Sequence, residues 1–263
     1  MLKSRDILIY FALKYCGNWR LMYDAITRKE KFSTTDVIDA NNTLTSKAIT
    51  ILDDDYPSFL KKIYCPPFVL FYHGDISLIN EELMKIAVVG SRDCSEYGVK
   101  MTDSLVSGIC RELIVVSGLA CGIDAVAHQT AISNGGKTIA ILGSGINYCY
   151  PDTNIYLYKE IKENHLVLSE YPHLTPPTKE SFPFRNRIIA ALGDATLVTE
   201  AHLKSGTMIT TSFALTFGRD VMCVPARADD DSACNKLIKE GAILVEDCDD
   251  IRRNMKTKIL KKS

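Results

Sequence analysis

The chain has 263 residues, a formal net charge of −1 and 46% hydrophobic residues. This composition is typical of a globular protein with one sizeable core, or with one core and a small module. A nearly neutral chain argues against non-specific binding of nucleic acid over the whole surface, although it allows a local basic groove.

The cysteines and the N-terminus bear on metal sites and on the compartment. None of the nine cysteines stands in a C-x-x-C pair or in a Cys/His cluster, so no metal site is expected. Reduced thiols are typical of a reducing compartment. The apolar part of the N-terminal stretch is too short to cross a membrane. We therefore expect a soluble cytoplasmic protein without a membrane partner.

The first part of the chain is predicted to be helical. Apolar residues recur at helical spacing and no β-rich run interrupts residues 1 to about 50, so residues 1–55 are predicted to form a small helical module. A connector follows, in which Pro57, Pro66 and Pro67 exclude a regular element. A short strand is predicted at 68–72.

From Lys85 onward, apolar runs of strand length alternate with helical stretches. Strands are predicted at 86–89, 114–116, 138–142, 166–168, 195–199, 221–224 and 243–245, and helices at 96–113, 123–134, 154–164 and 208–217. This alternation predicts an α/β fold with a doubly wound, mostly parallel, Rossmann-like sheet over residues 56–250. Residues 251–263 are predicted to be a basic C-terminal tail.

Glycine, serine and threonine recur where the predicted strands end, which is where ligands bind in such sheets. Glycine lets a backbone approach a ligand, and the amides that open a helix bind anions. A tight turn without any ligand also uses these residues, but their repetition along one edge favours a surface for several phosphates. The residues concerned are Ser91, Ser117, Gly118, Gly143, Ser144, Gly145, Ser205, Gly206 and Thr207.

Named catalytic and nucleotide motifs are missing. Gly-Ser-Gly at 143–145 lacks the third glycine of a dinucleotide fingerprint. Gly-Lys-Thr at 136–138 precedes a strand, so it is interpreted as a helix end followed by a surface lysine. Asp124 and His128 are four residues apart on a predicted helix and are interpreted as a surface pair. We therefore expect no enzyme and no cofactor.

The segment SFPFRNRIIA at 181–190 is the most informative. Arg185 and Arg187 offer planar forks that suit phosphates and stack on bases, Phe182 can stack, and Asn186 can bind a base edge. This mixture is typical of a groove for single-stranded nucleic acid. Lys179 and Lys204 extend the basic lip.

Each of these side chains also has a purely structural interpretation. Phe182 and Phe184 could pack in the core. Arg187 could form an internal salt bridge with Asp194 or Glu200.

These motifs resemble the DNA-processing protein A family (DprA, also called Smf) over most of the chain. The matching segments are YP at 56–57, FYHGD at 71–75, VVGSR at 88–92, SGLACGID at 117–124, GSG at 143–145, YP at 150–151, SEYP at 169–172, FPFRNRIIA at 182–190, SGT at 205–207 and VP at 224–225.

The resemblance implies an extended Rossmann fold and a dimer that binds single-stranded DNA. It also implies that the protein protects incoming strands in natural transformation, hands them to the recombinase RecA, and has no catalytic turnover. The DNA contacts that it implies are Arg92, Phe182, Arg185 and Arg187, with Ser91, Ser117, Gly143, Ser144 and Asn186 nearby. The expected DNA-binding set is completed by Gly118, Gly145, Lys179, Lys204, Ser205, Gly206 and Thr207.

The chain departs from the family in three places. Only the basic tail follows the Asp249-Asp250 pair, so we expect the winged-helix module of many members to be absent, and the N-terminal module looks like a short version of the family's helix-hairpin module. Ala226 stands where glycine often follows Val-Pro.

Two other hypotheses remain. The first is a nucleotide or nucleoside-phosphate enzyme similar to the Rossmann-type phosphoribohydrolases, although the turn at 204–207 lacks the double glycine of their P-G-G-x-G-T motif. The second is a scaffold for RecA that contacts DNA only incidentally.

Overall fold

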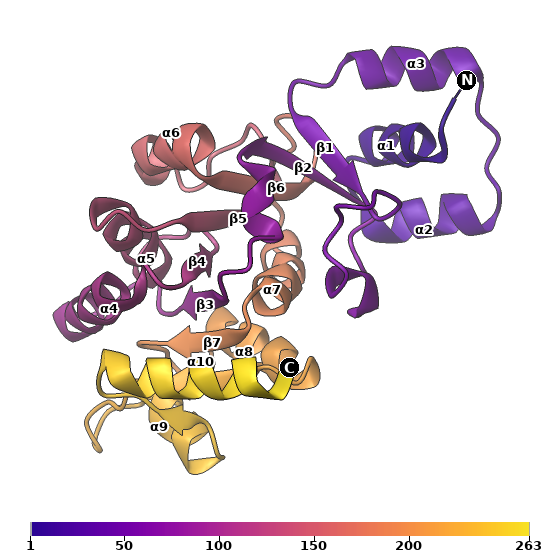
Figure 1. Cartoon of the computed structure of the whole chain (residues 1–263). Coiled ribbons are helices and arrows are strands. Elements are labelled where there is room, and N and C mark those ends of the chain that lie inside the picture. The colour runs from indigo at the N-terminus through magenta and orange to yellow at the C-terminus, as the bar shows by residue number, and fades with distance from the viewer. Residues whose placement is uncertain (1, 263) are drawn as a thin grey trace.

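The computed structural model describes residues 2–262, with side chains described up to residue 255. Within these residues nine strands form one sheet in the order β1-β2-β6-β5-β4-β3-β7-β8-β9 (Figure 1). The strands are β1 (Lys47–Thr50), β2 (Val69–Gly74), β3 (Lys85–Val89), β4 (Ile114–Ser117), β5 (Thr138–Gly145), β6 (Leu166–Tyr171), β7 (Ala195–Val198), β8 (Asp220–Cys223) and β9 (Ile243–Leu244). Strands β3 to β9 pair in parallel, whereas β1 and β2 are antiparallel, so the predicted fold class is confirmed.

Helices cover both faces of the sheet (Figure 1). The helices of one face are α4 (Glu96–Ile109), α5 (Ile123–Ser133) and α6 (Ile155–Asn164), and those of the other are α7 (Ser181–Leu192), α8 (Gly206–Thr216) and α9 (Ala233–Lys239). In β3, Ile86 and Val88 pack with α4 and α5, whereas Ala87 and Val89 pack with α7 and α8. Burial on both faces explains why the predicted strands are continuous apolar runs rather than alternating ones.

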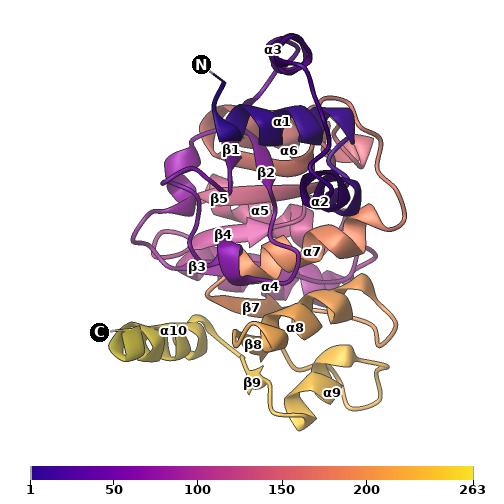
Figure 2. The same cartoon turned by 90° about the vertical axis from the view of Figure 1, so that its right-hand side faces the viewer.

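The N-terminal module contains α1 (Ser4–Lys14), α2 (Trp19–Thr27) and α3 (Thr34–Asn42), which pack near the antiparallel edge of the sheet (Figure 2). Residues 47–50, expected to be helical, instead form β1, which pairs with β2 from Lys47↔Tyr72 to Thr50↔Val69. The connector between β1 and β2 contains the short 3₁₀ turn η1 (Leu60–Lys62), and a second such turn, η2 (Ile76–Ile79), follows β2.

The C-terminal residues were expected to be a tail but form most of α10 (Cys248–Lys262). Ile251 and Met255 are buried in the cluster of α4 and α5. Arg252 pairs with Glu112 of the loop after α4 at 2.9 Å and with Asp249 at 2.9 Å. Thus the described part of this segment is packed on the fold, while the side chains after residue 255 lie outside the described residues.

Asp124 and His128 are not the surface pair that their spacing suggested. Asp124 accepts hydrogen bonds from the amides of Gly118 (3.1 Å) and Ala120 (3.4 Å), and His128 Nδ1 lies 2.6 Å from the hydroxyl of Thr138. Both side chains are buried, and burial lowers the pKa of His128 to about 3. They therefore hold α5 against the ends of β4 and β5 separately instead of pairing with each other.

Candidate nucleic-acid interface

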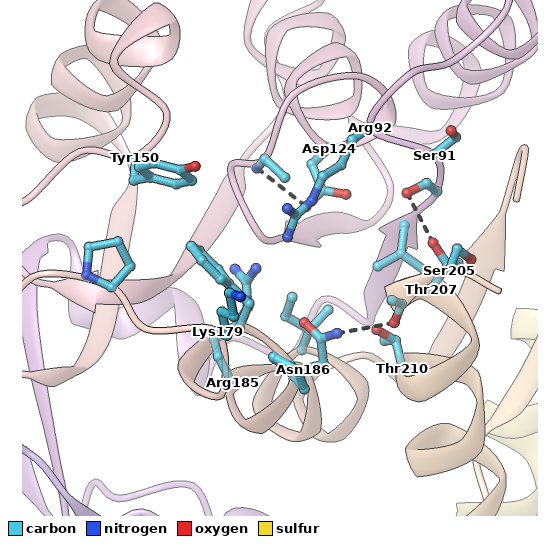
Figure 3. A pocket seen from close by; sticks show the side chains of 18 of the residues that line it. Ser91, Arg92, Asp124, Tyr150, Lys179, Arg185, Asn186, Ser205, Thr207 and Thr210 are labelled. Carbon is cyan, nitrogen blue, oxygen red and sulfur yellow. Dashed lines mark hydrogen bonds between the residues drawn. The ribbon is translucent and has the colours of Figure 1, made fainter. Parts of the chain in front are cut away.

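A groove of about 790 Å³ lies beyond the carboxyl ends of β3, β4 and β7, and we call it the strand-end groove (Figure 3). Its position follows from the topology. The chain leaves β3 toward β4 on one side and returns as β7 on the other side, so the connections diverge there and leave a crevice. Its lining residues are Val89, Gly90, Ser91, Arg92, Asp93, Ala120, Asp124, Tyr150, Pro177, Thr178, Lys179, Phe182, Pro183, Arg185, Asn186, Ile189, Ser205, Gly206, Thr207 and Thr210.

One side of the groove carries an aromatic and cationic surface, which we call the stacking ledge (Arg92, Phe182 and Tyr150). The Arg92 guanidinium lies 5.2 Å from the centre of the Phe182 ring, and the Tyr150 ring lies 5.4 Å from it at a 40° tilt. Phe182 rests on Gly143, where a Cβ atom would come within 2.8 Å of its ring. Arg92 and Tyr150 are exposed, so the ledge offers planar groups to a ligand.

The floor of the groove contains the charge of Arg185, whose side chain is only 4% exposed. Its Nη1 donates to the carbonyl oxygens of Gly118, at 2.7 Å, and of Ile141. Burial lowers the pKa of Arg185 to about 10, and neighbouring Asp124 opposes this shift, so the guanidinium keeps its charge at neutral pH. Its Nε atom is buried and has no hydrogen-bond partner.

The side opposite the ledge is the N-terminus of α8. Ser205 precedes the helix, and its buried hydroxyl has no hydrogen-bond partner. A Cβ atom on Gly206 would meet nothing within 4 Å, so the backbone there is open to a ligand. Asn186 donates to the carbonyl of Gly206 at 3.2 Å and Thr207 donates to that of Gly90 at 3.0 Å, which fixes α8 against α7 and β3. A helix N-terminus with a free hydroxyl suits an anionic oxygen.

The structure brings most of the predicted site residues to this groove. Those that line it are Ser91, Arg92, Lys179, Phe182, Arg185, Asn186, Ser205, Gly206 and Thr207. The remaining predicted residues lie outside its lining: Ser117, Gly118, Gly143, Ser144, Gly145, Arg187 and Lys204.

The residues outside the lining have other contacts. The hydroxyl of Ser117 donates to Val88 and that of Ser144 to Tyr148, while Gly145 packs on the backbone of residues 172–175. Lys204 is exposed beyond the groove.

Arg187 does not lie on the lip of the sheet, where the sequence placed it. Its side chain is fully buried, and its guanidinium donates to both carboxylate oxygens of Glu170 at 2.7 and 2.6 Å. It also donates to the carbonyls of Cys65 (3.0 Å) and Phe184 (2.8 Å) and stacks over the Phe184 ring at 3.7 Å. The internal salt bridge considered for Arg187 therefore exists, but its partner is Glu170.

The acids first considered for Arg187 are engaged elsewhere. Asp194 pairs with Arg219 at 3.3 Å, and Glu200 accepts hydrogen bonds from the backbone and hydroxyl of Ser95.

Sequence reasoning assigned no role to Tyr150, although its Tyr-Pro pair was part of the resemblance. Tyr150 is the fifth residue after β5, and only the fold brings its ring to Phe182 of α7. Asp124 was also missed, because it was interpreted as a surface residue.

Comparison with known proteins decides the family. Residues 47–256 match the family model described as DNA recombination-mediator protein A. The chain belongs to this family, known as DprA or Smf. DprA from Streptococcus pneumoniae is 46% identical over 206 residues, which cover 78% of this chain and 72% of that protein. DprA from Bacillus subtilis is 40% identical over 206 residues, covering 77% of this chain and 69% of that protein.

Solved DprA structures share the fold. The structure of DprA from Streptococcus pneumoniae aligns with a TM-score of 0.83 and 35% identity over 96% of this chain and 98% of the other. DNA processing protein A from Helicobacter pylori, which has a described single-stranded DNA binding mode, aligns with a TM-score of 0.71 and 28% identity over 84% of this chain and 98% of the other. The family resemblance and the extended Rossmann fold are thus confirmed, and the chain is a DNA-processing family member.

The described residues include neither a membrane-spanning helix nor a cluster of metal ligands. No helix between residues 2 and 262 is long and apolar enough to cross a membrane. In the same part of the chain, no group of three or more His, Cys, Asp or Glu side chains is arranged to hold a metal ion.

Proposed function

We propose that this DprA family member binds single-stranded DNA in the strand-end groove. The observation that carries the proposal is the pairing of two unlike surfaces across one groove. The stacking ledge offers planar groups on one side, and the N-terminus of α8 offers anion donors on the other. The buried charge of Arg185 lies between them.

The two sides of the groove bind different parts of the DNA. Unpaired bases stack on Phe182 and Tyr150, and phosphate oxygens accept hydrogen bonds from Ser205 and the first amides of α8. Arg92 can bind a phosphate or stack on a base. Its side chain is exposed, and a planar guanidinium is suited to both kinds of contact. Every base has a flat face, so binding is tolerant of sequence.

The same chemistry favours single strands over duplex. In a duplex the faces of the bases are already stacked on one another, so Phe182 and Tyr150 gain nothing from it. Duplex would retain only contacts to phosphates.

A competition assay tests this proposal. A labelled oligo-dT bound to the protein is challenged with unlabelled oligo-dT, the matching duplex and a mononucleotide. We expect single strands to displace the label far better than duplex. Equal displacement by duplex would contradict stacking as the basis of binding.

We also propose, following the family resemblance, that the chain acts as a cytoplasmic homodimer that protects incoming strands and passes them to RecA. The test is RecA filament formation on a strand already bound by this protein. The proposal requires faster nucleation than on a strand coated by an unrelated single-strand binder. A RecA pull-down that is independent of the groove would instead favour the scaffold hypothesis.

A second candidate is a nucleoside-phosphate enzyme, and the size of the groove favours it, since about 790 Å³ suits a small ligand. Against it, one of the two carboxylates that line the groove, Asp124, is already engaged, because it accepts two backbone hydrogen bonds. We propose binding without turnover. Release of ribose phosphate from a nucleoside monophosphate would overturn that proposal.

A further inference from the structure

A second groove, of about 1170 Å³, lies between the N-terminal module and the helices that flank the strand-end groove. We call it the aromatic groove. Residues of α2, the connector, α7 and α8 line it. Four large apolar or aromatic side chains on its lining are exposed: Leu21 at 46%, Tyr23 at 49%, Tyr64 at 70% and Ile209 at 38%. Contiguous exposed apolar surface of this kind marks an interaction site.

Two rings that line the aromatic groove, Trp19 and Tyr23, belong to a preformed stack of parallel rings that also includes Phe68. Trp19 lies between Tyr23, at 5.1 Å and 12°, and Phe68, at 5.3 Å and 13°. The indole N–H of Trp19 donates to the carbonyl of Pro66 at 2.8 Å, which fixes the orientation of the stack. Phe68 closes one end and Tyr23 forms the open end, so a further flat ring can extend the stack there.

The two grooves are continuous across the start of α7. Thr178, Lys179 and Pro183 line both of them. We call these three shared residues the ridge. On either side of the ridge, Phe182 lines the strand-end groove and Phe184 lines the aromatic groove. A strand that leaves the stacking ledge over Lys179 therefore enters the aromatic groove.

The charges of the aromatic groove are balanced. Its lining includes the cations Arg20 and Lys179 and the carboxylates Asp24 and Glu180. Phosphate attraction is therefore weak there, and any nucleic acid has to be held mainly by stacking. Stacking on Tyr23 depends less on salt than contacts to phosphates do.

From the continuity of the grooves and the open ring stack, we propose that the aromatic groove holds the continuation of the single strand bound in the strand-end groove. Unpaired bases stack on Tyr23 and Tyr64, and Lys179 at the shared ridge takes the phosphate between the two grooves. This inference rests on the proposed function, and it extends the site from one groove to two.

Trp19 provides a direct readout, because it is the single tryptophan of the chain. The full chain is titrated with a short oligo-dT of about 4 nucleotides and a long one of about 16, the limits of typical site sizes. The anisotropy of labelled DNA reports binding anywhere, and the emission of Trp19 reports occupancy of the aromatic groove. We expect the long oligonucleotide to change the Trp19 emission and the short one to bind without changing it.

Variants separate the two grooves. Tyr23→Ala and Tyr64→Ala, made as separate variants, should each lower the affinity for the long oligonucleotide by about 5-fold to 150-fold, which is the effect of losing one stacked base. The affinity for the short oligonucleotide should not change. The slope of affinity against salt should stay the same. Tyr23→Phe keeps the ring and should bind as wild type. Tyr156→Ala, an 82% exposed tyrosine on α6, is the matched control.

The outcomes distinguish this inference from the proposed function. If both oligonucleotides bind but neither tyrosine variant weakens the long one, the strand leaves by another route and the inference fails while the proposed function stands. If Trp19 emission depends on protein concentration without DNA, a second copy of the chain occupies the groove and the inference fails. If neither oligonucleotide binds the wild type, the proposed function itself fails.

Discussion

Replacing Arg187→Ala should make the protein easier to unfold and should leave the proposed DNA-binding surface of the folded protein in place. The sequence suggested the opposite, a loss of affinity through a lost phosphate contact. The structure gives Arg187 four hydrogen bonds inside the fold, two of them to the carboxylate of Glu170, which is itself only 5% exposed. Removing the arginine leaves this carboxylate buried without its charged partner.

The magnitude follows from the loss of that partner. Removing one partner of a buried ion pair lowers the free energy of unfolding by about 3–5 kcal/mol, because the remaining charge stays buried without a partner. For a domain of this size, about 1 kcal/mol lowers the melting temperature by roughly 2–4 °C. Arg187→Ala should therefore lower Tm by roughly 6–20 °C.

The assay is thermal unfolding followed by circular dichroism, together with oligo-dT binding well below Tm. A double variant, Arg187→Met with Glu170→Leu, is the control, since it removes both charges and should be more stable than Arg187→Ala alone. An Arg187→Ala protein with the wild-type Tm and a much weaker affinity for oligo-dT would refute this reasoning and restore Arg187 as a DNA contact.

Three further predictions concern the groove and the core. Arg92→Ala should weaken the binding of single strands of any sequence and lower the slope of affinity against salt by about one. Lys137 is an exposed cation at the opposite end of β5, so Lys137→Ala should change neither the affinity nor the slope. An unchanged slope for Arg92→Ala would exclude a phosphate contact. Gly143→Ala should displace the Phe182 ring, because its Cβ would lie 2.8 Å from that ring, and should weaken binding by up to about 1–3 kcal/mol in the same anisotropy assay; unaltered affinity would exclude Phe182 as a stacking platform. His128 is neutral in the fold because burial lowers its pKa from 6.5 to about 3, so as pH falls below 6.5 the unfolded chain binds a proton that the folded chain does not, and the fold loses stability. The difference in unfolding free energy between wild type and His128→Gln should narrow over that range in urea titrations, and a constant difference would show that His128 titrates alike in both states.

The central sheet could be predicted from the sequence because its signal is local. Strands such as β3 and β7 are continuous apolar runs, and both faces of these strands are buried by helices. β1 could not be predicted in this way, since Lys47–Thr50 contains only two apolar residues and is a strand only through its pairing with β2. The helix α9 could not be predicted either, because its seven residues are too few to show a helical periodicity.

The site could be predicted as a region but not residue by residue. The strand order determines at which edge of the sheet the groove lies, and nine of the predicted residues line the groove there. The direction of each side chain on α7 could not be predicted, because both arginines fit a phosphate contact equally well in the sequence. In the structure Arg185 faces the groove floor and Arg187 faces Glu170. Tyr150 reaches the ledge only through the tertiary fold.

The most direct test of single-strand binding in the strand-end groove is the anisotropy of a labelled oligo-dT over a salt titration, for wild type and for a variant with both Arg92→Ala and Phe182→Ala. Binding in the strand-end groove predicts that the wild type binds the oligonucleotide tightly and in a salt-sensitive manner and binds the matching duplex weakly. For the variant, we expect a large loss of affinity and a shallower salt slope, with an unchanged melting temperature. Equal affinity of the two proteins for the oligonucleotide would contradict binding in the strand-end groove, because it would place the DNA on another surface.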